Sequence, residues 1–175
     1  MRTKKTMAEL RRPTMTEFKS ADKIPLSLVL DDIRSANNVG SIFRTADCFA
    51  ITHVYLCGIT AQPPHRDILK TALGATECVS WSYHEDAVAL TRELSEGGTA
   101  VFALEQTHDS VPLRGFSVDG YKAVAVVVGN EVNGVNQAVI DACDGAIEIE
   151  QFGTKHSLNV AVAAALVVFE LRGRF

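Results

Sequence analysis

Residues 124–137 read VAVVVGNEVNGVNQ, and residues 146–175 read AIEIEQFGTKHSLNVAVAAALVVFELRGRF. In the first stretch a run of apolar residues, Val124–Val128, stops abruptly at Gly-Asn-Glu. In the second, a short apolar segment, Ala146–Ile149, runs into a glycine-containing loop that opens a long helix rich in Ala, Val and Leu. Twice, therefore, a buried-type strand ends at a polar loop that faces the start of a helix. In α/β sheets this junction, at the carboxyl end of the strands, is where ligands bind.

The rest of the chain alternates strand-like and helix-like segments in the same way. Apolar runs predict further strands at residues 26–30, 54–56, 78–83 and 99–104. Apolar residues at helical spacing predict a helix at residues 41–49. Two further helices are predicted at residues 66–73 and 85–94, and glycines beyond each of these two are expected to end it. The sequence therefore predicts the α/β class, with a mostly parallel sheet of about five or six strands flanked by helices.

Helix starts are predicted from residues whose side chains accept hydrogen bonds from free backbone N–H groups. Asn37 or Asn38 is expected to cap the helix at 41–49, and Ser157 is expected to cap the last helix. Residues 108–121 contain one proline and two glycines, so we expect them to form a loop.

Composition is typical of one globular domain that buries a substantial core, since the chain has 175 residues, 47% apolar and 22% charged. The longest apolar run, residues 160–169, is shorter than the roughly 18–20 residues that a membrane span needs. The N-terminus lacks the apolar core of a secretory signal. We therefore expect a cytoplasmic protein with no membrane partner.

The cysteines form no CxxC pair and no Cys/His spacing of the kind that binds metal. They lie far apart in apolar surroundings, and we expect buried, reduced thiols and no metal. The four positions are Cys48, Cys57, Cys78 and Cys143.

The net charge of −4 argues against generic nucleic-acid binding, and we expect no DNA partner. Residues 1–25 differ from the remainder because they carry seven Lys and Arg side chains against three acidic ones. Such a basic arm can neutralise RNA phosphates, although a merely solvated terminal segment has the same composition. We therefore divide the chain into a basic N-terminal extension, residues 1–25, and a single domain, residues 26–175.

Familiar phosphate-binding and nucleophile motifs are absent: there is no GxGxxG after the first strand, no GxxxxGK[ST] and no GxSxG. Polar residues instead form three clusters at strand ends. These clusters are Asn38 with Arg44, the Gly129–Glu131 segment, and the Ser157–Asn159 segment.

Each cluster also has a purely structural interpretation. Arg44 lies one to two turns into a helix whose other face is apolar, so it is also explained as a surface arginine. Glu131 is also explained as the cap of the helix that follows Asn136, and Ser157 as the cap of the last helix. Each motif is weak when it is taken alone, and their order along the chain carries more information.

In that order the sequence resembles the SpoU branch of the SPOUT methyltransferases, which includes the TrmH-type RNA 2′-O-ribose methyltransferases. Residues 38–46 match the pattern N-x-G-x-x-x-R-x-A, and residues 127–135 contain G-x-E-x-x-G-[VI]. Residues 149–163 match I-P-x-x-G-x-x-x-S-L-N-V-S-x-A, except that Glu150 replaces the proline and Ala161 replaces the second serine. The resemblance spans nearly the whole chain.

The resemblance implies a deep trefoil knot in the C-terminal part, and a homodimer that builds its active site across the subunit interface. It also implies S-adenosylmethionine as the cofactor, S-adenosylhomocysteine as the product and no metal. Glu150 changes the backbone and the charge of a loop expected to touch the cofactor. By position, the cofactor-binding residues are expected to be Leu104, Glu105, Val128, Gly129, Asn130, Glu131, Ile149, Gln151, Ser157, Leu158 and Asn159.

For catalysis the resemblance implies that Arg44 activates a ribose 2′-hydroxyl. Because a guanidinium has a pKa above about 12, we favour stabilisation of the developing alkoxide and clamping of a phosphate over proton abstraction. Asn38 and Glu131 are expected to orient Arg44 or the substrate, and Ser157 and Asn159 to shape the loop beneath it.

The resemblance also implies a structured RNA as the substrate, first a guanosine ribose in the D-loop of tRNA and second an rRNA ribose. By the same resemblance, residues 1–25 are expected to assist tRNA binding. Two other functions fit parts of the pattern: a non-catalytic RNA-binding protein on the same fold, and a small-molecule α/β enzyme that uses the same strand ends.

Overall fold

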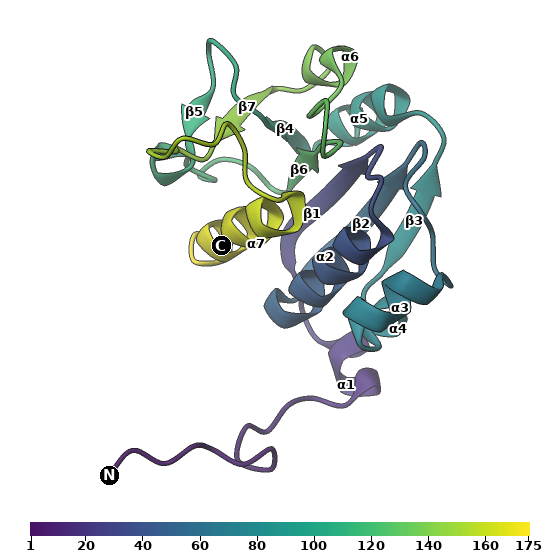
Figure 1. Cartoon of the computed structure of the whole chain (residues 1–175), viewed down its shortest axis with the longest axis vertical. Helices are drawn as coiled ribbons and strands as arrows, with labels where there is room; N and C mark the ends of the chain where they lie inside the picture. The colour runs from purple at the N-terminus through teal and green to yellow at the C-terminus, as the bar shows by residue number, and fades with distance from the viewer.

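A seven-stranded, entirely parallel sheet is the centre of the computed structural model, which describes all 175 residues (Figure 1). The strand order is β3-β2-β1-β6-β4-β7-β5. The strands are β1 Ile24–Asp31, β2 Ile51–Cys57, β3 Trp81–His84, β4 Ala100–Leu104, β5 Val111–Pro112, β6 Val124–Val128 and β7 Gly145–Glu148. The predicted α/β class is confirmed, and the strand beyond the expected number is β5, two residues inside the segment expected to be a loop.

Helices cover both faces of this sheet. The helices are α1 Met15–Ser20, α2 Ala36–Phe49, α3 Arg66–Ala72, α4 Ala75–Cys78, α5 Ala87–Glu96, α6 Gln137–Ile140 and α7 Val160–Arg172, with a 3₁₀ turn, η1, at Leu113–Gly115. The larger core, of 29 buried residues, lies between the sheet and α2, α3, α4, α7 and η1. The smaller core, of 11 buried residues, lies between the opposite face and α5 and α6.

Strand β6 shows why the central strands read as continuous apolar runs. All five of its residues are buried. Val124, Val126 and Val128 belong to the larger core, whereas Ala125 and Val127 belong to the smaller one. Successive side chains of a strand point to opposite faces, and both faces of this sheet are covered by helices, so neither face needs polar residues.

The order in which the chain adds strands to the sheet changes direction between β1 and β6: β2 and β3 lie beyond β1 on one side, and β4, β7 and β5 lie beyond β6 on the other. These strands are direct parallel neighbours, paired from Leu26 with Val124 to Leu30 with Val128, so both end at the same edge. From that edge β1 leads to α2 on one face, and β6 leads towards α6 on the other. A crevice opens where neighbouring connections leave for opposite faces, and ligands of α/β proteins bind there.

Two helix starts differ from the sequence prediction. Helix α2 begins earlier than expected, and its cap is Ser35, whose extended backbone precedes the helix and whose Oγ accepts from the Asn38 N–H at 3.4 Å. Asn37 and Asn38 therefore lie inside the helix. Helix α7 is capped by Asn159, whose Oδ1 accepts from the next two free N–H groups at 2.9 and 3.3 Å, and not by Ser157.

The segment around Cys78 was also predicted incorrectly. Cys78 ends the short helix α4, and strand β3 starts only at Trp81. Strand β3 pairs with β2 alone, so it is an edge strand, as its weak alternation indicated.

All four cysteines are free, but only one is fully buried. Burial raises the pKa of the Cys57 thiol to about 12, so this thiol stays protonated. Cys78 and Cys143 are half-buried, and Cys48 is exposed. The prediction of buried thiols is therefore wrong for Cys48, because that residue lies on the side of α2 away from the core residues Val39, Ile42, Phe43 and Ala46.

The N-terminal extension leaves the domain as an arm that ends far from the sheet (Figure 1). Helix α1 attaches it: Phe18 is buried, and the Lys23 ammonium lies 3.8 Å from the centre of the Phe18 ring. Thr14 and Glu17 form a reciprocal capping box that starts this helix. None of the helices is long and apolar enough to cross a membrane.

Gly40 is required where α2 crosses α3. A Cβ atom at Gly40 would lie 2.1 Å from Thr71 Oγ1 and 2.4 Å from the backbone oxygen of Ile68. We predict that Gly40→Ala lowers the free energy of unfolding by about 1–3 kcal/mol, because the overlap exceeds the gain in helix propensity. Gly115→Ala, at a position with open space around it, is the control and should stay within about 0.5 kcal/mol. Urea unfolding measures both, and equal stability of the two variants would show that the helices move apart at no cost.

Candidate functional site

A cleft of about 1340 Å³ opens at the carboxyl edge of the sheet. It is bounded by the loops that follow β4, β6 and β7 and by the first turn of α7. The structure places all eleven residues of the expected cofactor site on its wall. They are Leu104, Glu105, Val128, Gly129, Asn130, Glu131, Ile149, Gln151, Ser157, Leu158 and Asn159.

Several further residues that line this cleft were missed from the sequence. The most prominent are Gln106–Asp109, a polar run that continues from Glu105 after the end of strand β4. The other loops were located because polar residues follow a buried strand at the carboxyl edge of the sheet. The segment after β4 shows the same pattern, so the sequence contained the information needed to predict these residues. His156, an exposed residue of the loop between β7 and α7, also lines the cleft.

The side chain at position 150 does not line the cleft. Glu150 is exposed, whereas its neighbours Ile149 and Gln151 both contribute to the wall. Neighbouring residues of an extended segment point in opposite directions, so the charge of Glu150 faces solvent. The Glu150 side chain therefore lies on the outer side of the loop.

The loop between β7 and α7 offers unpaired backbone groups to a ligand. Residues 152–158 are all exposed, and none of their N–H groups donates a hydrogen bond within the chain. The loop is tied to the opposite wall by Gln106, whose Nε2 donates to the His156 carbonyl oxygen at 2.9 Å. Glu105 ties two walls together, because its carboxylate accepts from the Gln106 N–H at 2.9 Å and from the Val135 N–H at 3.1 Å.

Glu131 connects the cleft to the start of helix α2. Its carboxylate accepts hydrogen bonds from the Arg34 N–H at 2.9 Å, the Ser35 N–H at 3.0 Å and Asn38 Nδ2 at 2.8 Å. Asn38 Oδ1 in turn accepts from Asn159 Nδ2 at 3.1 Å. Three of the five predicted catalytic residues, one from each sequence block, are therefore in direct contact.

These contacts decide the charge of Glu131. Burial raises its pKa, but the hydrogen bonds from the Arg34 N–H, the Asn38 amide and the Ser35 N–H lower it, and the net effect is a lowered pKa. The carboxylate is ionised at neutral pH. The interpretation of Glu131 as the cap of the following helix is wrong, since Asn136 caps α6 itself through the Ala138 N–H at 3.0 Å.

A tight turn, Asn130–Gly134, presents Glu131 in this position. The backbone groups of Asn130 and Gly134 exchange two hydrogen bonds, of 3.0 and 2.9 Å, and Gly134 adopts a φ of +70°. The Asn130 side chain donates to the Asp32 carbonyl oxygen at 2.8 Å, which fixes the turn against the end of β1. A Cβ at Gly129 would lie 2.2 Å from the Gly134 carbonyl carbon, so this position accepts only glycine.

Arg44 and Ser157, the other two predicted catalytic residues, stand apart from this network. Arg44 is exposed on α2, and the chain's one salt bridge joins Arg174 to Glu170, so the Arg44 guanidinium has no carboxylate partner. Ser157 is exposed in the cleft loop and its hydroxyl makes no hydrogen bond within the chain. Both groups are thus free to contact a substrate. No group of three or more His, Cys, Asp or Glu side chains is placed to hold a metal ion.

Comparison with known proteins gives consistent results. A family model described as the SpoU rRNA methylase family matches residues 25–169. The chain is 32% identical over 162 residues to a tRNA (guanosine(18)-2′-O)-methyltransferase of Thermus thermophilus, covering 93% of this chain and 81% of that protein. It is 31% identical over 148 residues to a 23S rRNA (guanosine-2′-O-)-methyltransferase RlmB of Neisseria meningitidis, covering 85% of this chain and 58% of that protein.

Solved structures share the fold. The TrmH/SpoU tRNA modifying enzyme of A. aeolicus superimposes with a TM-score of 0.79 at 24% identity, over 90% of this chain and 78% of that one. An AdoMet-bound rRNA methyltransferase from Sinorhizobium meliloti also gives 0.79 at 24% identity, over 93% of this chain and 61% of that one.

The bridge made by Asn38 can be tested with its neighbour as the control. Asn37 is exposed and its side chain makes no hydrogen bond, so Asn37→Ala and Asn38→Ala bring the same gain in helix propensity. We predict that Asn38→Ala is less stable than Asn37→Ala by about 1–2 kcal/mol, because it removes hydrogen bonds to Glu131 and Asn159. Chemical unfolding at neutral pH measures the difference, and equal stabilities would show that the bridge contributes nothing to the fold.

Proposed function

The chain belongs to the SpoU rRNA methylase family, and from that premise we propose that it transfers a methyl group from S-adenosylmethionine to a ribose 2′-hydroxyl of RNA. The observation that carries the proposal is the contact of Asn38, Glu131 and Asn159 at the mouth of the large cleft. Residues from three distant blocks converge where a cofactor and a ribose would meet.

The cleft suits the proposed cofactor. Apolar side chains, among them Leu104, Ile149 and Leu158, offer a surface for an adenine ring. The free backbone N–H groups of residues 156–158, which line the cleft, can donate to the acceptor atoms of the ring, the ribose and the carboxylate. The Glu105 carboxylate retains acceptor capacity for a ribose hydroxyl or an ammonium group. S-adenosylmethionine bound here supplies an electrophilic methyl group on a cationic sulfur.

The residues around the cleft mouth position the nucleophile. Attack by a ribose oxygen requires in-line geometry, so holding the ribose contributes a large part of the rate. We assign Arg44 to the hydroxyl, whose developing negative charge its guanidinium stabilises. Asn38, held by Glu131, orients the ribose, and Ser157 and Asn159 shape the loop on the cofactor side.

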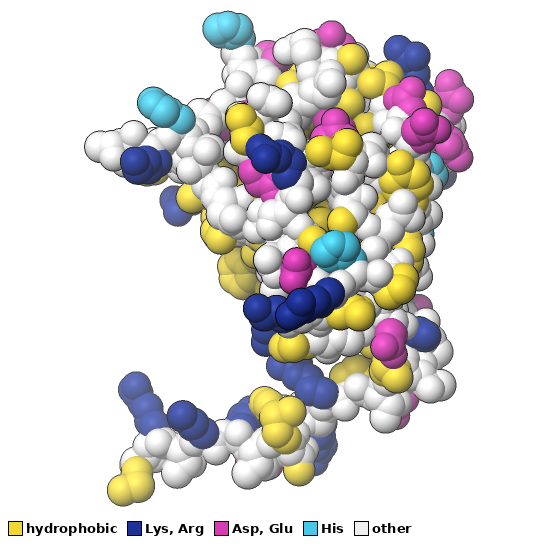
Figure 2. Space-filling model, turned by 45° about the vertical axis from the view of Figure 1, so that its right-hand side comes forward, with side chains coloured by type: hydrophobic (Ala, Val, Ile, Leu, Met, Phe, Trp, Pro, Cys, Tyr) yellow, Lys and Arg dark blue, Asp and Glu magenta, His cyan; other side chains and the backbone are white.

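For the substrate we propose tRNA, with a guanosine of the D-loop as the first target. The name of the Thermus thermophilus relative supports this choice, and this chain spans 81% of that protein. The basic residues 1–25 form an arm that can reach RNA beyond the site, and Figure 2 shows Lys and Arg side chains along that arm. A cytoplasmic location belongs to the same proposal. An rRNA ribose is the alternative, supported by the name of the Neisseria meningitidis relative.

We also propose that the protein works as a homodimer with a knotted C-terminal part, as the family resemblance implies. Helix α7 supports the dimer because it exposes an apolar stripe at helical spacing: Val162 at 49%, Leu166 at 42% and Phe169 at 65% exposure. The Phe169 ring also meets the Phe49 ring edge-on at 6.0 Å, so the stripe continues onto α2, the helix that carries Arg44. A partner packed there would lie beside the proposed catalytic residues.

Methyl transfer tests the activity. With labelled S-adenosylmethionine, we predict label on tRNA for the wild type and a loss of roughly 10²–10³-fold in Arg44→Ala, since one positioned charge-stabilising group is removed. Arg92→Ala, at an exposed position of α5, is the matched control and should keep full activity. Thermal stabilisation by S-adenosylhomocysteine should be unchanged in Arg44→Ala, because Arg44 does not line the cleft.

Other outcomes of that experiment would correct the proposal. Label on rRNA alone would keep the chemistry and change the substrate. Loss of S-adenosylhomocysteine binding in Arg44→Ala would make Arg44 a structural residue. Cofactor binding with no label on either RNA would favour the non-catalytic RNA-binding alternative, and stabilisation by other nucleotides alone would favour a small-molecule enzyme.

The dimer can be tested with a pair of apolar residues of matched exposure. Phe169 on α7 and Ile59 on the loop after β2 are 65% and 66% exposed. We predict that Phe169→Glu shifts the protein to a monomer in light scattering, because a charge enters the apolar contact, whereas Ile59→Glu leaves a dimer. A monomeric wild type, or equal behaviour of the two variants, would place the contact elsewhere or remove it.

A further inference from the structure

The hollow between α2 and α3 is separate from the cleft. Its volume is about 450 Å³, and its seven lining residues are Ser41, Arg44, Thr45, Cys48, Phe49, Lys70 and Thr71. We propose that this hollow is the subsite for the RNA backbone next to the target ribose, and that Lys70 is a positioning residue that holds a phosphate beside Arg44. This inference rests on the proposed function and names the part of the substrate that the hollow takes.

The chemistry of the wall is that of an anion site. It combines two cations, Arg44 and Lys70, with three hydroxyls, and it contains no carboxylate. Neither cation forms a salt bridge, in a chain whose net charge is −4. An arginine fork and a lysine point charge are the usual partners of phosphate oxygens.

The hydroxyls divide into two kinds. Ser41 Oγ and Thr71 Oγ1 both donate to the Asn37 carbonyl oxygen, at 2.9 and 3.0 Å, so their protons are already used within the protein. Thr45 makes no side-chain hydrogen bond and remains free to donate. An anion in the hollow would therefore be bound by Arg44, Lys70 and Thr45.

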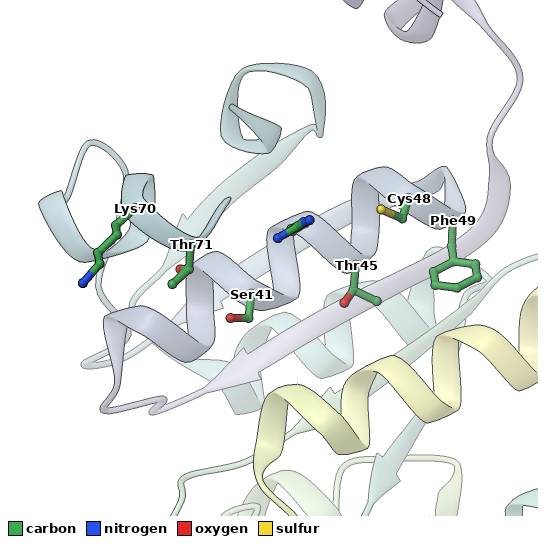
Figure 3. A pocket seen from close by; sticks show the side chains of 7 residues that line it. Ser41, Thr45, Cys48, Phe49, Lys70 and Thr71 are labelled. Carbon is green, nitrogen blue, oxygen red and sulfur yellow. The ribbon is translucent and has the colours of Figure 1, made fainter. Parts of the chain in front are cut away.

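The polar end of the hollow leads towards the cleft mouth. In Figure 3 Thr71, from α3, lies near Ser41 and Lys70 lies beyond Thr71, while Cys48 and Phe49 lie at the other end of α2. Asn38, which touches Glu131 and Asn159, precedes Arg44 by six positions on α2, about 9 Å along the helix axis. A nucleotide whose ribose lies at the cleft mouth would thus place a neighbouring phosphate over the hollow.

The two cations are held on a rigid base. Gly40 allows α2 and α3 to approach so closely that a single methyl group would overlap with Thr71 Oγ1 and the Ile68 carbonyl oxygen. The core side chains Ile42, Phe43, Ile68 and Ala72 fix both helices from below. The backbone that carries Lys70 and Arg44 is therefore fixed before RNA binds, which limits the entropy lost on binding.

The experiment compares Lys70→Gln with Lys122→Gln in the full chain. Lys122 is exposed and precedes β6, at the opposite edge of the sheet from the cleft, so both variants lose the same charge. We expect Lys70→Gln to raise KM for the methylated RNA roughly fivefold to tenfold with kcat little changed. The slope of log affinity against log salt should fall by about 0.7–0.9, as for the loss of one phosphate contact. Lys70→Arg should restore KM, and Lys122→Gln should match the wild type.

The outcomes separate this inference from the proposed function. If the wild type methylates RNA and Lys70→Gln has the same KM and salt slope as Lys122→Gln, the subsite is overturned while the activity stands. If the wild type methylates no RNA, the proposed activity fails, and the salt slope of tRNA binding measured by filter binding still tests Lys70. A fall in kcat or in S-adenosylhomocysteine binding, with KM and slope unchanged, would also contradict a role in holding phosphate.

Discussion

The carboxylate of Glu131 at the start of helix α2 is the interaction on which the site depends. It binds the N–H groups of Arg34 and Ser35 and the side chain of Asn38, so it joins residues up to 97 positions apart. An ionised carboxylate is well placed there, because the N-terminus of a 14-residue helix carries partial positive charge and unpaired N–H groups. The lowered pKa of Glu131 keeps the charge that this contact requires.

The contact of Glu131 with the start of α2 requires close approaches of the backbone, and two glycines, Gly129 and Gly40, allow them. Gly129 lets the turn after β6 fold back on Gly134, and Gly40 lets α2 lie against α3. Beneath these close approaches, β1 and β6 are paired along five residues and buried on both faces. A polar network near the surface thus acquires fixed geometry from an apolar core, where side chains have few alternative positions.

The two sides of the site are built differently. The proposed cofactor side consists mainly of loops with free backbone groups, held together by Glu105 and by the contact of Gln106 with His156. The proposed RNA side consists of helices, with Arg44 and Lys70 on neighbouring elements and neither in a salt bridge. Loops can adjust around a small molecule that must enter and leave, whereas helices keep charges in position for a large substrate. Asn38 lies on helix α2, on the proposed RNA side, and contacts Glu131 and Asn159 on the cleft side.

The sequence by itself determined the α/β class, the central strands, the edge at which the candidate site lies and the family. Apolar runs such as Val124–Val128 specify buried strands directly, and each polar block follows such a strand or opens the helix after it. The order of the three blocks then indicated the family, which the comparisons confirm.

The tertiary structure decided which polar residues meet. The local pattern near Asn38 favoured a helix cap, but Ser35 caps α2, and this leaves Asn38 free to bridge Glu131 and Asn159. Lys70 and Arg44 line the same hollow only because of how α2 and α3 are packed. The outward position of Glu150 likewise depends on how the last loop is packed. Such contacts join segments that only the strand order brings together, and strand order depends on long-range pairing that no local pattern encodes.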